Sequence, residues 1–287
     1  MSLQPPKATK TTFLRILEAL QFFLHKSIKN LLHYNLNKFL HTENIMERRS
    51  FLKVVAASAT VVAINPSLIR GTLYADNGML YRAYERTQLI AANGKPILAS
   101  KLEKEVNYIF NYPYASTPCL LVDLPKPTAT DVELTSETGE KYIWKSGVGK
   151  NRTIVAYVAI CTHQLTHPTP SDSFISYVPM NGKTMAYDKS GIFVCSSHLS
   201  AFDAQAGAKV LGGAATQPLS AVVLEVAADD TIWAVGILGA DKFQDYFKAY
   251  KPELKQFYNG PAEAKKLVSI SAKTVKLTEF SKEIIQY

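Results

Sequence analysis

The spacing of hydrophobic positions changes along the chain. In residues 12–40, apolar side chains recur every three or four positions, which predicts an amphipathic helix. From residue 117 to residue 240, short apolar runs alternate with turn residues, which predicts a mainly β fold. The predicted strands are Pro118–Leu124, Lys141–Trp144, Thr153–Ile160, Phe174–Val178, Gly191–Val194, Val222–Val226 and Ile232–Gly236.

The segments on either side of this β region have mixed patterns. Residues 76–116 include a helix-like stretch near Leu102–Phe110. In residues 241–287, aromatic side chains first lie at helical spacing and are then interrupted by Pro252. This tail is predicted to be partly helical, and it either pads the domain or docks a partner.

A possible export signal precedes the β region. Met46 is a second plausible start, and the residues from Arg48 to Lys53 read Arg-Arg-Ser-Phe-Leu-Lys, which resembles the twin-arginine motif. The apolar run Val54–Ile64 is shorter than the roughly 20 residues of a membrane span. We therefore expect export to the periplasmic side of a bacterial inner membrane, with cleavage near Ala75 and an uncleaved anchor both open.

The charge of the chain is concentrated at its start. The net charge is +8, and residues 1–53 hold nine Lys or Arg against three Asp or Glu. This asymmetry favours a targeting segment or a membrane surface and gives no support for nucleic-acid binding. Three cysteines exclude a disulfide framework, and Cys119, inside a predicted strand, is expected to be a buried apolar residue.

Two short motifs carry the candidate chemistry. Cys161-Thr-His163 and Cys195-Ser-Ser-His198 each follow a predicted strand, so each loop supplies one thiol and one imidazole. A structural zinc site takes two thiolates and two imidazoles around one ion. A two-iron cluster takes both Cys on one iron and both His on the other. Alternation of Cys and His in each loop favours the cluster, because each iron then takes one ligand from each loop.

Residues 117–240 resemble a Rieske iron–sulfur domain. The two Cys-His motifs match its cluster loops, Ser200 matches a hydroxyl donor, and Gly212–Pro218 falls where the family has a proline-containing third loop. The resemblance implies an antiparallel β-sandwich or barrel with a cluster-binding subdomain. It also implies a [2Fe–2S] cofactor, with ligands Cys161, His163, Cys195 and His198 and with Ser200 donating to the cluster.

The sequence departs from the family at three positions. Family members from cytochrome bc-type complexes carry two further cysteines that form a disulfide between the loops, and Thr166 and Ser197 stand there. Phe202 replaces the tyrosine that donates to a ligand sulfur. Fewer donors to a reduced cluster lower its potential, so we predict a potential below that of the usual quinol-oxidising members. His167 is expected to be a loop histidine near the cluster.

The predicted function is one-electron transfer by a subunit rather than by an enzyme acting alone. The spacing and the ending of the domain look most like the iron–sulfur subunit of a membrane quinol–cytochrome c oxidoreductase. Its partners would be cytochrome b and c-type cytochrome subunits or another redox subunit, with quinol possible. The alternatives are a small Rieske subunit of an exported molybdenum oxidase such as arsenite oxidase, a ferredoxin serving an oxygenase, and a zinc module.

These inferences divide the chain into five segments. They are an amphipathic segment (1–45) that is either membrane-binding or a mis-assigned start, a twin-arginine signal or anchor (46–75), a mixed extension (76–116), a Rieske domain (117–240) and a C-terminal extension (241–287).

Overall fold

The structure is a computed structural model that describes residues 80–287. The predicted amphipathic segment and the twin-arginine motif lie outside the described residues. Within residues 80–287, no helix is long and apolar enough to cross a membrane.

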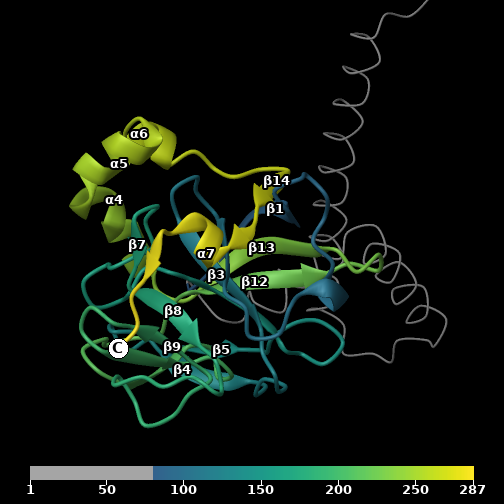
Figure 1. The fold of residues 1–287 in the computed structure, drawn as a ribbon, viewed down its shortest axis with the longest axis vertical. Helices are drawn as coiled ribbons and strands as arrows, with labels where there is room; N and C mark the ends of the chain where they lie inside the picture. Colours follow the sequence, from purple (N-terminus) through teal and green to yellow (C-terminus); the bar gives the residue numbers. More distant parts are fainter. Residues whose placement is uncertain (1–79) are drawn as a thin grey trace, which may run out of the picture. The chain divides into compact units, whose positions relative to one another are not determined.

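An eight-stranded sheet forms the larger layer (Figure 1). Its strands, in spatial order, are β14 (Ser271–Lys273), β1 (Tyr81–Ile90), β13 (Ile232–Leu238), β12 (Ala221–Val226), β6 (Ile154–Val158), β3 (Pro118–Asp123), β2 (Tyr108–Asn111) and β15 (Val275–Lys276). Only Thr274 separates β14 from β15, yet the two strands pair with opposite edges of the sheet. The tail therefore draws the two edges together into a nearly closed barrel.

A smaller four-stranded antiparallel sheet carries part of the candidate site. Its strands are β8 (Ile175–Val178), β9 (Ile192–Cys195), β10 (Ser200–Asp203) and β11 (Lys209–Gly212). Two short pairs complete the β structure: β4 (Val132–Thr135) with β5 (Lys141–Trp144), and β7 (Asp172–Ser173) with β16 (Glu283–Ile284). The predicted mainly β fold is confirmed.

The tail is partly helical, as predicted. It contains η3 (Asp241–Asp245), α4 (Tyr246–Ala249), α5 (Lys251–Tyr258), α6 (Pro261–Ala264) and α7 (Leu277–Phe280). Pro252 lies in the first turn of α5, where its missing N–H is not needed. Figure 1 shows α4–α6 gathered beside β7, with α7 and the rest of the tail running on past β8 and β9.

The helix predicted near Leu102–Phe110 is wrong. The short η2 helix (Ala99–Lys101) ends before it, and the second half of the stretch enters β2. In β2, Phe110 pairs with Cys119 of β3, and neighbouring Ile109 and Phe110 are both buried on opposite faces of the sheet. The spacing of apolar residues in this stretch fits either a helix or a strand. Packing against both faces of the sheet selects the strand.

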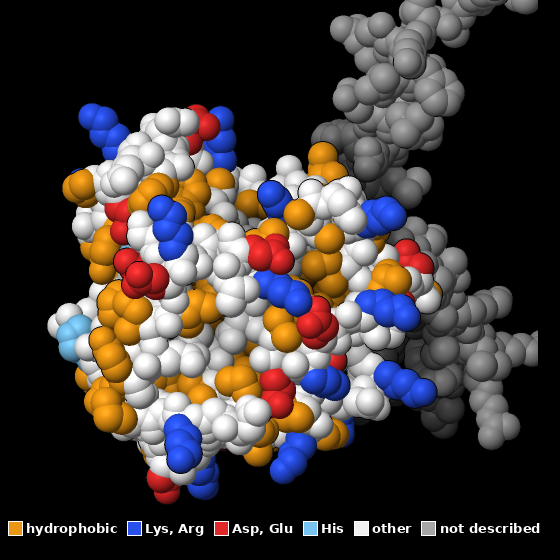
Figure 2. Space-filling model, in the orientation of Figure 1, with side chains coloured by type: hydrophobic (Ala, Val, Ile, Leu, Met, Phe, Trp, Pro, Cys, Tyr) orange, Lys and Arg blue, Asp and Glu red, His pale blue; other side chains and the backbone are white. Residues whose placement is uncertain are grey.

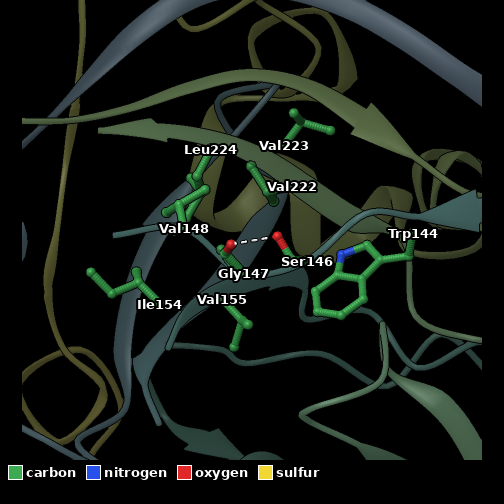
Figure 3. A pocket seen from close by; sticks show the side chains of 10 residues that line it. Trp144, Ser146, Gly147, Val148, Ile154, Val155, Val222, Val223 and Leu224 are labelled. Atoms are coloured by element: carbon green, nitrogen blue, oxygen red, sulfur yellow. Dashed lines mark hydrogen bonds between the residues drawn. The ribbon is translucent and has the colours of Figure 1, made fainter. Parts of the chain in front are cut away.

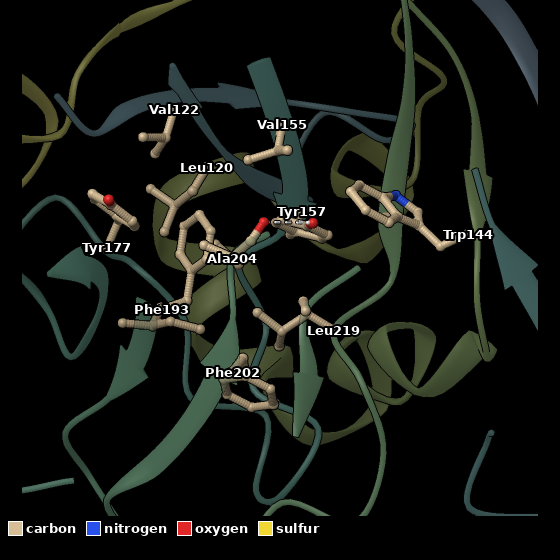
Figure 4. Close-up of a cluster of buried hydrophobic side chains, with 14 of the residues drawn as sticks. Leu120, Val122, Trp144, Val155, Tyr157, Tyr177, Phe193, Phe202, Ala204 and Leu219 are labelled. Carbon is tan, nitrogen blue, oxygen red and sulfur yellow. Dashed lines mark hydrogen bonds between the residues drawn. The ribbon is translucent and has the colours of Figure 1, made fainter. Parts of the chain in front are cut away.

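Two buried clusters cover the two faces of the large sheet. One lies between the two sheets and includes Tyr157, Phe193 and Phe202 (Figure 4). Within it, the Tyr157 hydroxyl donates to the carbonyl oxygen of Ala204 at 3.2 Å. The other lies under the tail helices and includes Cys119, which is fully buried as predicted. Burial on both faces explains why β3 and β6 read as continuous apolar runs.

Candidate iron–sulfur site

The two Cys-His loops have matching backbone designs. Cys161 follows β6, and Cys195 is the last residue of β9. Four residues after each Cys stands a leucine in the left-handed region: Leu165 with φ 62° and Leu199 with φ 53°. Such a conformation costs free energy in a residue with a side chain, so the surrounding contacts must hold both loops in place.

The two thiols are brought together. Cys161 and Cys195 are both buried, and their side chains share a hydrogen bond. That bond, together with burial, raises the pKa of the Cys161 thiol. Cys195 accepts the bond from Cys161 and further bonds from backbone N–H groups of the same loop, which lowers its pKa to about 7. Bound metal would supply the positive charge that allows both sulfurs to be thiolates.

The two imidazoles also lie side by side. The ring centroids of His163 and His198 are 4.8 Å apart, and the rings are perpendicular. Nδ1 of His163 is buried without a hydrogen-bond partner, which is costly for a polar atom unless it binds something. The His198 side chain is exposed.

This pairing fits a two-iron cluster better than a single ion. The Cys161 thiol lies beside the Cys195 thiol, and the His163 ring lies beside the His198 ring. A structural zinc site needs four ligands around one point, whereas each iron of a Rieske cluster takes two protein ligands. A Rieske cluster therefore requires the two thiols to lie together and the two imidazoles to lie together, as they do here.

Two side-chain hydroxyls donate to the sulfurs. The Ser200 hydroxyl is hydrogen-bonded to Cys161, and the Thr166 hydroxyl is hydrogen-bonded to Cys195. Ser200 was predicted as a donor from the sequence. The sequence does not predict Thr166 as a donor, because the direction of its hydroxyl depends on how the two loops face each other. Phe202 is fully buried and offers no donor.

The third loop ties the first two together. Its Ala215 N–H donates to Oγ of Ser200 at 3.1 Å, and Thr162 of the first loop donates to the carbonyl oxygen of Gln217 at 2.7 Å. Gly213 has φ 83°, and a Cβ there would overlap the backbone of Leu199 and Ser200. Glycine is required because the third loop lies directly against the second.

The tail also reaches the first loop. His167 is buried, and its Nε2 lies 2.6 Å from Oε1 of Glu253 in α5. The Tyr250 hydroxyl donates to the carbonyl oxygen of Gln164 at 3.2 Å. His167 lies in the first loop as predicted. Its partner Glu253 is not predictable from local sequence, because the two residues are 86 positions apart.

An imidazole reaches the molecular surface beside apolar side chains. Figure 2 shows histidine atoms at one edge of the molecule, with hydrophobic side chains nearby. His198 is exposed, and the neighbouring Leu199 is 36% exposed. A redox partner could therefore approach the site at the tip of the second loop.

A small cavity lies away from these loops. It is lined by Trp144, Ser146, Gly147 and surrounding aliphatic side chains of β6 and β12 (Figure 3). The Ser146 hydroxyl donates to the carbonyl oxygen of Gly147 at 2.9 Å beside it. The volume of the cavity is ≈ 20 Å³, which is enough for about one water molecule. It is not part of the candidate site.

The fold and the site together define a β-sheet protein in which two adjacent loops each present one Cys and one His. The chain belongs to the Rieske iron–sulfur protein family, whose members carry a [2Fe–2S] cluster. It is 30% identical over 194 residues to iodate reductase subunit IdrB of Denitromonas iodatirespirans, covering 68% of this chain and 82% of that protein.

Two further proteins are similar to the chain. The chain is 31% identical over 130 residues to iodate reductase subunit IdrB of Pseudomonas sp. strain SCT, covering 45% of this chain and 52% of that protein. A solved structure, the soluble domain of Rieske protein II (SoxF) from Sulfolobus acidocaldarius, is 23% identical with a TM-score of 0.38, covering 65% of this chain and 93% of that one. No family model matches the chain.

Proposed function

We propose that this chain is the small electron-transfer subunit of an exported oxidoreductase that acts on an inorganic oxyanion. Cys161 and Cys195 would bind one iron of the [2Fe–2S] cluster, and His163 and His198 would bind the other. The observation that carries this ligand set is the pairing of thiol with thiol and imidazole with imidazole across the two loops. The cluster would accept and release one electron at a time.

The side chains around the ligands would perform distinct tasks. Ser200 and Thr166 would donate hydrogen bonds to the ligand sulfurs and stabilise the more negative reduced state. The half-buried ring of His163, with its buried Nδ1, would keep water from one side of the centre. The exposed ring of His198 would face the partner.

The relatives favour the molybdenum-oxidase alternative over the quinol–cytochrome c interpretation. Both are named as subunits of iodate reductase, an oxidoreductase that is not a cytochrome bc complex. A partner would therefore be a larger catalytic subunit rather than cytochrome b. Affinity purification of the tagged chain from its native cells should retrieve that catalytic subunit. Retrieval of cytochrome b and a c-type cytochrome would instead support the quinol-oxidising role.

The spectrum of the purified protein tests the cofactor and its ligands. We expect a reddish-brown protein whose reduced form gives an EPR signal of low average g value. Cys161→Ser and Cys195→Ser should each abolish that signal. Cys119→Ser should leave it unchanged, because Cys119 is buried in the hydrophobic core under the tail helices, away from the two loops. Colourless protein that contains zinc would overturn the proposal.

Export is part of the proposal and rests on Arg48 and Arg49. A twin-arginine route carries folded proteins, which suits a cofactor inserted before export. Cell fractionation should place the wild-type protein on the periplasmic side of the inner membrane. A variant with both arginines changed to Lys should remain in the cytoplasm with its cluster intact, and unchanged export would contradict this route.

A further inference from the structure

Side chains from α4, from α5 and from Tyr250 between them contact the first cluster loop. We call this group the loop clamp: His167 and Tyr246, which are buried, and Glu253 and Tyr250, which are half-buried. Both ring nitrogens of His167 face oxygen atoms, Nδ1 at 2.7 Å from the carbonyl of Leu165 and Nε2 at 2.6 Å from Glu253. The tyrosine rings flank the imidazole at centroid distances of 4.5 and 4.7 Å.

The clamp holds consecutive parts of the loop. The Tyr250 hydroxyl binds the carbonyl of Gln164, and His167 binds the carbonyl of Leu165, which is the strained left-handed residue. The Tyr246 hydroxyl donates to Glu253 at 3.3 Å and so keeps the carboxylate turned inward. Thr166, the residue that donates to Cys195, stands between Leu165 and His167.

The helices that carry the loop clamp are anchored by buried side chains. Tyr246, Phe247 and Leu254 are almost completely buried in the cluster under the large sheet. The Phe247 ring packs edge-on against Tyr114 with centroids 5.4 Å apart. Side chains packed in this way have little freedom to move, so a contact made from α4 or α5 fixes its target relative to the sheet.

We propose that Glu253 is a positioning residue for the cluster: through His167 it fixes the first loop, and with it the Thr166 hydroxyl against Cys195. The loops have no covalent link, since Thr166 and Ser197 occupy the positions where a bridge would stand. The C-terminal extension supplies the constraint instead. The predicted effect of Glu253 on the iron–sulfur cluster rests on the proposed function. Its predicted effect on the mobility of the first loop does not.

The test compares Glu253→Ala with a control, Glu263→Gln. Glu263 lies on α6, and its exposed carboxylate pairs with Lys266. In the purified holoprotein, Glu253→Ala should speed amide hydrogen exchange in residues 161–167, lower the midpoint potential and hasten loss of iron on warming. Glu253→Gln, which keeps an acceptor for its neighbours, should recover most of the wild-type behaviour. The control should match the wild type.

A milder variant covers the case in which Glu253→Ala does not fold. Tyr250→Phe removes one hydroxyl from a partly exposed ring and should shift exchange and potential in the same direction by a smaller amount. Wild-type exchange and potential in both Glu253→Ala and Tyr250→Phe would overturn the proposal. A wild-type protein without a [2Fe–2S] cluster would refute the proposed function alone, because the exchange comparison can still be made on that protein.

Discussion

The hydroxyl of Thr166 is hydrogen-bonded to the sulfur of Cys195, across the gap between the two cluster loops. The resemblance to family members from cytochrome bc-type complexes implies a cysteine of an inter-loop disulfide at this position. Here the same position links the loops by a hydrogen bond, and that bond also acts on the Cys195 sulfur. Loss of the covalent bridge is thus partly offset by a donor that such a bridge does not provide.

Thr166→Val should lower the midpoint potential. The substitution keeps the β-branched shape and removes the donor, and a bond of ~1 kcal/mol that favours the reduced state corresponds to roughly 40 mV for a one-electron couple. Redox titration followed by EPR measures the shift. Thr135→Val, at an exposed position of β4, serves as the control. An unchanged potential in Thr166→Val would show that the hydroxyl does not act on the sulfur.

Ser200→Ala should have two effects, because Ser200 makes two bonds. Loss of the bond to Cys161 should lower the potential, and loss of the acceptor for Ala215 N–H should loosen the third loop. Leaving a buried N–H unpaired costs about 1–3 kcal/mol. Thermal unfolding and redox titration on the same sample separate the effects. A drop in potential without any loss of stability would contradict the role assigned to the Ala215 bond.

Phe202→Tyr should raise the potential. The sequence predicts a low potential because Phe202 lacks the hydroxyl that the family uses, and that prediction awaits a redox titration. Phe193→Tyr is the matched control, since Phe193 pairs with Phe202 across β9 and β10 and lies in the same buried cluster. An equal shift in both variants would point to a change of packing rather than to a new donor.

Gly213→Ala should destabilise the protein by at least about 2 kcal/mol. The added Cβ would meet the backbone of Leu199 and Ser200, and the positive φ adds strain. Urea unfolding measures the loss. Gly94→Ala is a useful control, because Gly94 also has positive φ but has open space around it. If the two variants lose equal stability, strain alone accounts for the effect and the close approach does not.

Stability should fall at high pH. Burial raises the pKa of Tyr112, Tyr142 and Tyr157, so these side chains stay protonated in the folded protein. Unfolded tyrosines ionise near about pH 10, so above that pH the folded state binds more protons and stability decreases as pH rises. Urea unfolding at about pH 8 and 11 tests this.

Tyr157→Phe should separate the two contributions of that residue. At pH 8 it should lose about 1 kcal/mol with the bond to Ala204. It should also show a smaller decrease between the two pH values, since one buried phenol is gone. Equal stability of the wild type at both pH values would contradict the sign of this prediction.

The sequence misses β1 (Tyr81–Ile90), whose partly exposed side chains form no apolar run. Within residues 117–240 it predicts β3, β6, β12 and β13, because each is a short apolar run, and β5 begins and ends at the predicted residues. It also predicts which Cys, His and Ser residues the structure brings together. It does not predict that Leu102–Phe110 enters a strand, since burial on both sides of β2 comes from distant partners. Nor does it predict the loop clamp or the direction of the Thr166 hydroxyl, because these depend on how separate segments pack.

The separation of His167 from Glu253 has a consequence for the order of events during synthesis. The two residues are 86 positions apart. At roughly 5–20 residues per second, α5 leaves the ribosome some seconds after the first loop does. During that interval both cluster loops can exist while the first is still unclamped. Until α5 emerges, the first loop lacks its contact with Glu253, so a cofactor inserted in that interval would meet a loop that is less constrained than in the finished protein.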